Sequence, residues 1–81
     1  MEKRIGSVLI LINEKDSINK LNHIISDHAD IILGRQGLPL RDKQINVISL
    51  VLEGTTDQMS ALTGKLGRLS GVQVKSIVAR V

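Results

Sequence analysis

The sequence predicts an α+β domain of the ferredoxin-like class, with a four-stranded antiparallel sheet and two helices on one of its faces. Three observations predict it. Four segments rich in β-branched and aliphatic residues alternate with two segments of helical apolar spacing, in the order β-α-β-β-α-β. The first and third β segments are the most apolar, as expected for the central strands. The 81 residues leave room for one such domain, residues 1–81.

The first β segment and the first helix are predicted over residues 4–12 and 17 to about 28. Residues 4–12 are aliphatic at odd and even positions alike, which is typical of a strand buried on both faces. Asp16 or Ser17 is predicted to cap the helix, because a short side-chain oxygen accepts an unpaired backbone N–H there. Helical spacing marks the buried side of the helix at Ile18, Leu21, Ile24 and Ile25.

The second strand is predicted over residues 30 to about 36. Its aliphatic run, residues 31–33, favours a strand, but Gly34, Gly37 and Pro39 weaken a hydrogen-bonded ladder. We therefore expect an edge strand that runs into a loop, with an exposed turn at residues 41–43.

The second half of the chain repeats the pattern. Residues 44–53 predict a strand that is apolar on both faces, and Gly54 ends it. Thr55 and Gln58 have the spacing of a capping box at the start of a second helix. Apolar residues at helical spacing continue that helix until Gly71, and residues 72–81 predict the last strand. The apolar side of the helix consists of Met59, Leu62, Leu66 and Leu69.

The central strands offer an apolar set to each face of the sheet, although two helices can cover only one face. The uninterrupted set is assigned to the helix side: Val8, Ile10, Ile12, Ile48, Leu50 and Leu52. A second set is interrupted by serines. Its exposure would exceed the apolar patch of an ordinary monomer. We expect a second copy to cover it, in a homodimer or homotetramer; a membrane, another partner or an ordinary exposed sheet are the alternatives. The predicted contact consists of Ser7, Leu9, Leu11, Val47, Ser49, Val51 and Ser76.

The composition argues against an enzyme and against several kinds of binding protein. Without cysteine the chain has no disulfide, thiolate metal site or thiol nucleophile, and without Phe, Tyr or Trp it lacks the rings that stack bases. No phosphate-binding loop, dinucleotide fingerprint or nucleophile motif occurs, so we expect no catalytic residues and no cofactor. The net charge of +3 is scattered. No signal sequence or membrane span is evident, and we expect a cytoplasmic protein.

The two histidines, His23 and His28, are weak candidates for metal ligands. They lie five residues apart on the predicted helix, about 140° around its axis, so they cannot share a metal from that helix alone. A surface His23 and a helix-terminal His28 are the simpler interpretation.

Two segments give the chain a family resemblance. The segments are Gly-Arg-Gln-Gly-Leu-Pro at residues 34–39 and Thr-Gly-Lys-Leu-Gly at residues 63–67. With them the chain resembles, over almost its whole length, a family of small bacterial proteins described as regulators of the iron-only hydrogenase system. The resemblance implies an ACT-like ferredoxin fold related to the C-terminal domain of the nickel-responsive repressor. The cysteine and the later histidines of that repressor are missing here, and so is its ribbon-helix-helix segment. We therefore expect neither nickel sensing nor direct DNA binding.

The resemblance also implies a small-molecule site, since ACT-like domains bind ligands beside the loop after the first strand and near the end of the second. Arg35 would pair with an anionic ligand. The function expected is a regulatory or ligand-sensing oligomer that is not an enzyme. A protein that binds nucleic acid directly and a metal sensor with an intersubunit site are the alternatives. The implied ligand-binding residues are Asn13, Asp16, Ser17, Gly34, Arg35, Gln36 and Gly37.

Overall fold

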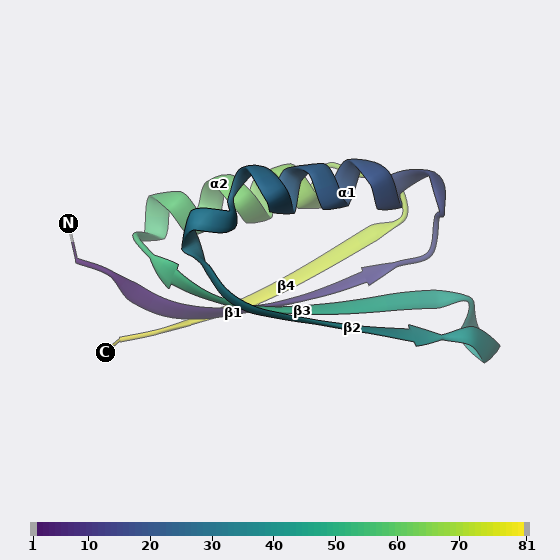
Figure 1. Ribbon diagram of the computed structural model, residues 1–81, viewed down its shortest axis with the longest axis horizontal. Helices are drawn as coiled ribbons and strands as arrows, with labels where there is room; N and C mark the ends of the chain where they lie inside the picture. Colours follow the sequence, from purple (N-terminus) through teal and green to yellow (C-terminus); the bar gives the residue numbers. More distant parts are fainter. Residues whose placement is uncertain (1, 81) are drawn as a thin grey trace.

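The computed structural model describes residues 2–80 and has two layers, a four-stranded antiparallel sheet and a pair of helices (Figure 1). The strand order is β2-β3-β1-β4, so the two most apolar strands are central, as predicted. The ferredoxin-like α+β class is confirmed. The elements are β1 (Arg4–Ile12), α1 (Asp16–Asp27), β2 (Ile32–Leu40), β3 (Ile45–Gly54), α2 (Thr56–Gly67) and β4 (Val72–Ala79), with 3-10 turns η1 (Ala29–Ile31) and η2 (Arg41–Lys43).

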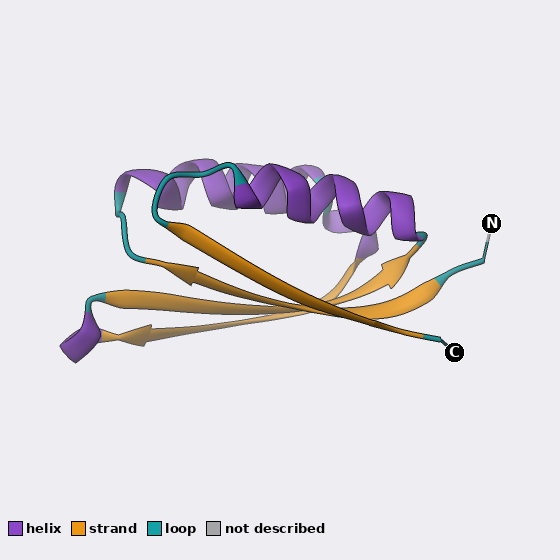
Figure 2. Ribbon diagram, turned by 180° about the vertical axis from the view of Figure 1, so that it is seen from behind, coloured by secondary structure: helices purple, strands orange, loops and turns teal. Residues whose placement is uncertain are grey.

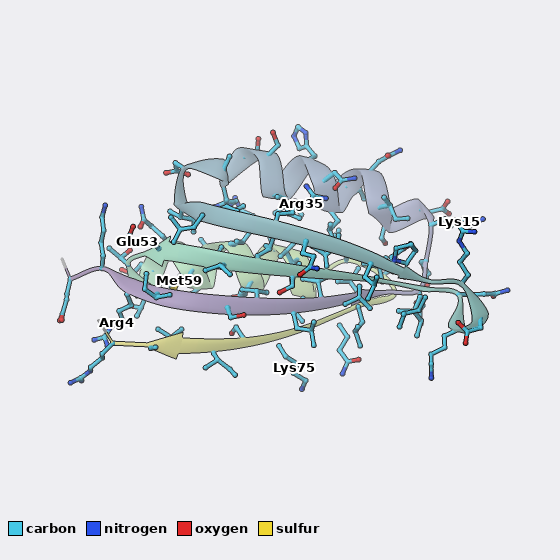
Figure 3. The ribbon with its side chains drawn as sticks, turned by 60° about the horizontal axis from the view of Figure 1, so that its bottom comes forward. Arg4, Lys15, Arg35, Glu53, Met59 and Lys75 are labelled. Carbon is cyan, nitrogen blue, oxygen red and sulfur yellow. The ribbon has the colours of Figure 1, made fainter. Side chains whose placement is uncertain are left out.

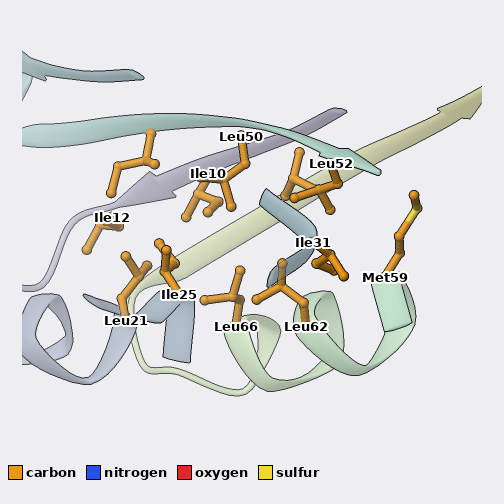
Figure 4. Close-up of a cluster of buried hydrophobic side chains, with 12 residues drawn as sticks. Ile10, Ile12, Leu21, Ile25, Ile31, Leu50, Leu52, Met59, Leu62 and Leu66 are labelled. Atoms are coloured by element: carbon orange, nitrogen blue, oxygen red, sulfur yellow. The ribbon is translucent and has the colours of Figure 1, made fainter. Parts of the chain in front are cut away.

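The core lies between the helices and one face of the sheet (Figure 4). All six residues assigned to the helix side are buried, and Ile10, Leu50 and Leu52 are completely inaccessible. The register explains this, because Val8 lies opposite Leu50 and Ile10 opposite Ile48. Directly opposed residues of an antiparallel pair project to the same face. From the helices and η1 the core receives Leu21, Ile25, Ile31, Met59, Leu62 and Leu66.

The two helices begin differently. In α2 the predicted capping box is confirmed: Thr55 Oγ1 accepts from the Gln58 backbone N–H at 3.2 Å, and the Thr55 N–H donates to Gln58 Oε1 at 2.9 Å. In α1 the predicted cap is wrong. Lys15 occupies the N-cap without a side-chain bond, and Ser17 is already helical. The Ser17 hydroxyl is buried and donates to the Ser70 carbonyl at 2.6 Å, because the α2–β4 turn packs against this first turn.

Strand β2 is longer than predicted. It begins after η1 and continues through both glycines to Leu40, where it pairs with Ile45. Pro39 is tolerated because β2 is an edge strand and has a neighbour on one side only. A bulge between Ile32 and Gly34 shifts the register, and the long partner strand β3 supports the extension.

Helix α2 and strand β4, in contrast, are shorter than predicted. Helix α2 ends at Gly67, and the chain turns before Gly71, whose φ of 70° is left-handed. The Gly71 carbonyl accepts from the Asn13 N–H at 2.9 Å, which joins the start of β4 to the end of β1. Strand β4 ends at Ala79; Val81 of the predicted strand lies outside the described residues. No helix within residues 2–80 is long and apolar enough to cross a membrane.

Candidate functional site

One face of the sheet carries no helix, and we call it the open face (Figure 3). Its residues form rows across the strands, since Ser7 lies between Val51 and Ile77, and Leu9 lies between Ser49 and Lys75. Strand β2 adds Gln36 beside Ser49 and Leu38 beside Val47. The open face consists of Ile5, Ser7, Leu9, Leu11, Gly34, Gln36, Leu38, Leu40, Ile45, Val47, Ser49, Val51, Glu53, Gln73, Lys75, Ile77 and Ala79.

Large apolar side chains on the open face are exposed. Leu9 retains 45%, Val51 42%, Leu38 57% and Ile77 75% of its accessible surface. These four come from all four strands, so the exposure extends across the whole width of the sheet. The face carries a single cation, Lys75, and a single carboxylate, Glu53, among its described residues.

The prediction that Ser76 belongs to the open face is wrong. Ser76 lies opposite Val8, whose side chain points into the core, so Ser76 projects to the helix side. Ile77 takes the open-face position beside Ser7. The apolar pattern of β4 did not reveal this, because Ile77 and Val78 are adjacent and both apolar, and the register with β1 decides which one faces which side.

A second feature is a groove on the helix side of the sheet. One wall is α1 and the loop before it, and the other wall is the β2–β3 hairpin. Two adjoining cavities of about 410 and 240 Å³ form it, and they share Ile12, Pro39 and Asn46. We call this the α1 groove. Its polar lining residues are Asn13, Glu14, Lys15, Asn22, Arg35, Arg41, Gln44 and Asn46.

The α1 groove contains three of the seven residues implied as ligand-binding, namely Asn13, Arg35 and Gly37. Gly34 and Gln36 lie instead on the open face, where they pair with Val51 and Ser49. The remaining two are at the start of α1, outside the groove lining: Ser17 is buried against the α2–β4 turn and Asp16 is exposed.

Residues of the groove that the sequence did not indicate come from α1 and from the hairpin. Asn22 and Arg41 are examples, and both are polar residues of a kind found on any surface. Their grouping depends on how the β2–β3 hairpin extends beneath α1, which no local pattern encodes.

The groove carries excess positive charge. The Arg35 guanidinium donates to Asn22 Oδ1 at 2.7 Å, which holds it beside α1. Within residues 2–80 the one contact with salt-bridge geometry joins His23 and Asp27, so Lys15, Arg35 and Arg41 have no carboxylate partner there. Glu14 is the single carboxylate in the lining.

The two histidines do not converge. His23 Nε2 lies 3.6 Å from Asp27 Oδ2, with both side chains well exposed. His28 closes the end of α1, and its Nε2 lies 3.1 Å from the Lys65 ammonium on α2. No cluster of three or more His, Cys, Asp or Glu side chains suited to a metal occurs within the described part of the chain.

Comparison with known proteins identifies the family. The sequence profile described as "TM1266-like: Iron-only hydrogenase system regulator, putative" matches residues 4–76, which is most of the chain. The chain belongs to the TM1266-like family. The solved structure of the uncharacterized protein TM1266 from Thermotoga maritima has a TM-score of 0.93 and 34% sequence identity, covering 98% of this chain and all of that one.

More distant structures share the fold of this TM1266-like protein. The C-terminal domain of the MgtC protein from Mycobacterium tuberculosis has a TM-score of 0.73 at 15% identity, covering 95% of this chain and 88% of that one. A structure described as an unknown protein from Galdieria sulphuraria has a TM-score of 0.66 at 13% identity, covering 99% of this chain and 47% of that one. No protein with a curated description matches the sequence.

Proposed function

We propose that this TM1266-like protein is a non-catalytic regulatory module that self-associates through its open face and binds a small anionic ligand in the α1 groove. Its family is described as regulatory. The observation that carries the proposal is the apolar open face. Leu9 and Val51 are central in the sheet, yet both remain exposed in the single chain.

The dimensions of the sheet suit a contact between two copies. The chain measures 41 × 19 × 16 Å, and the view down its shortest axis shows the sheet beneath the helices (Figure 1). A face of 41 by 16 Å covers about 650 Å², close to the roughly 800 Å² per partner of a standard interface. A second copy supplies the same surface with the same exposed apolar side chains.

The α1 groove supports the ligand-binding part of the proposal. Arg35 at one end and Lys15 and Arg41 at the other provide cations, and amides from Asn13 and Asn46 lie nearby. A guanidinium already oriented by Asn22 pairs well with a carboxylate or phosphate. An elongated anion would contact both ends of the groove.

Sedimentation velocity of the wild type and of Leu9→Lys at micromolar concentration tests the open-face contact. A lysine at Leu9 places a charge in the middle of the contact and leaves the core on the other face of the sheet intact, so the associated mass should fall while the circular dichroism stays unchanged. Ala61→Lys, on the exposed side of α2, is the matched control and should retain the wild-type mass. A monomeric wild type would contradict the proposal.

A further inference from the structure

Strand β4 forms an edge of the sheet with a regular outer side (Figure 2). It pairs with β1 alone, without a bulge, from Val72 opposite Ile12 to Ala79 opposite Ile5. In an antiparallel ladder, every second residue directs its backbone N–H and C=O away from the paired neighbour. The outer side of β4 therefore offers an even row of donors and acceptors to another strand.

The opposite edge, β2, carries features that hinder such pairing. A bulge interrupts it between Ile32 and Gly34, and Pro39 has no N–H to donate. Strand β4 contains no proline, glycine or bulge. Its single charged side chain, Lys75, projects from the open face opposite Leu9 (Figure 3) and leaves the outer backbone accessible.

Apolar side chains are exposed on both faces of β4. Ile77, on the open face, is the most exposed of the large apolar side chains within residues 2–80. Val78 lies opposite Gly6 on the helix side and retains 45% of its accessible surface. A copy stacked on the open face would cover Ile77 and leave Val78 in water. A strand placed alongside β4 would shield both.

We propose that β4 pairs antiparallel with β4 of a second copy, about a two-fold axis at Ser76, to form a continuous eight-stranded sheet. In this register Val74 lies opposite the partner's Val78, and Lys75 lies opposite the partner's Ile77. The apolar stem of Lys75 covers the isoleucine while its ammonium reaches water. A two-fold axis repeats each of these pairs, so the contact is self-complementary.

Neighbouring registers are less favourable. An axis at Lys75 would place the two Lys75 side chains directly opposite each other, and like charges there are destabilising. An axis at Ile77 would place Val78 opposite the partner's Ser76 and Val74 opposite the partner's Arg80. Both valines would then lose an apolar neighbour.

The helix side leaves space for this contact. A cavity of about 180 Å³ lies between α2 and the strands β1 and β4. Helix α2 lines it with Thr56, Met59, Ser60 and Thr63, and β4 lines it with Ser76, Ile77 and Val78. Because the two-fold axis stands perpendicular to the sheet, the second copy keeps its helices on the same side. The partner's Val74 then adds to the wall of this cavity. The edge contact is separate from the open-face contact, and neither requires the other.

Cysteine crosslinking tests the register, since the natural chain has no cysteine. Opposed Cα atoms in an antiparallel ladder are about 4.5 or 5.5 Å apart, within the range of about 4.4–6.8 Å that a disulfide spans. Ser76→Cys should therefore yield a covalent dimer under mild oxidation. Val74→Cys on the same strand face is the matched control. It should crosslink at least ten times more slowly, because its copy lies four residues further along the ladder.

Several outcomes would overturn the edge contact or its register. Ser76→Cys crosslinking no faster than Val74→Cys would refute the contact, and so would faster crosslinking of Gly37→Cys on β2. In the Leu9→Lys background, which removes the proposed open-face contact, faster crosslinking of Lys75→Cys or Ile77→Cys would refute the register. Leu9→Lys combined with Ser76→Cys should still crosslink, which separates this contact from the proposed open-face contact.

Discussion

Ser17 shows that a hydroxyl side chain near the start of a helix does not always cap it. A serine before an apolar helical pattern usually caps the helix, and Thr55 does so in α2. Ser17 instead lies one residue inside α1, buried, with its hydroxyl on the Ser70 carbonyl. It holds the first turn of α1 to the α2–β4 turn, and Gly71 supports the same junction through its left-handed backbone.

Ser17→Ala should lower the free energy of unfolding by about 1 kcal/mol, because it removes the part-buried hydrogen bond from the buried Ser17 hydroxyl to the Ser70 carbonyl. Urea denaturation measures this value. Ser26→Ala, on the exposed side of α1, should leave stability unchanged. Equal stability of the two variants would contradict the structural role, and a selective loss of anion binding in Ser17→Ala would return Ser17 to the ligand site.

At the scale of elements, the α1 groove exists because β2 extends beyond the predicted strand and presents little bulk to the helix side. Gly37 lies opposite Ile48 on that side, and a Cβ added there meets nothing within 4 Å. The groove floor is therefore open at Gly37. The same extension places Arg41, at the end of the hairpin, in the lining of the cavity that Lys15 also lines.

Gly37→Val should weaken anion binding in the α1 groove at least tenfold, because its side chain occupies the groove without a clash inside the chain. Isothermal titration with glutamate and with inorganic pyrophosphate measures the effect. Gly34→Val is the matched control, since a Cβ there is also unobstructed but projects to the open face. Equal binding by both variants, or none by the folded wild type, would contradict the groove as an anion site.

At the scale of the molecule, the proposed open-face contact would have its two-fold axis parallel to the sheet, and the proposed β4 edge contact would have its axis perpendicular to the sheet. If the two axes intersect, they generate a closed assembly of four chains, in which two eight-stranded sheets stack on each other. The helices would then lie on the outside of both sheets, with the α1 grooves facing water. The core of each chain lies within its own two layers, so neither contact is part of it.

The wild type should therefore sediment as a tetramer, Leu9→Lys and Val78→Lys each as a dimer, and the double variant as a folded monomer. Each lysine adds charge to one contact at a side chain that is already exposed in the single chain. Sedimentation equilibrium gives the masses, and near-unchanged circular dichroism confirms folding. A double variant that keeps the wild-type mass would refute both contacts.

The sequence by itself determined the order of the elements, the two central strands, the helix-side core and the capping box of α2. Each of these depends on periodicity or spacing within one segment, such as Ile10 and Ile12 two residues apart, or Thr55 and Gln58 three apart. The tertiary structure alone decided the length of β2, the face on which Ser76 lies and the set of residues that line the α1 groove. These depend on register between strands distant in the sequence. Pro39 is tolerated only because one side of β2 is unpaired, and Ser76 turns to the helix side only because Val8 lies opposite it.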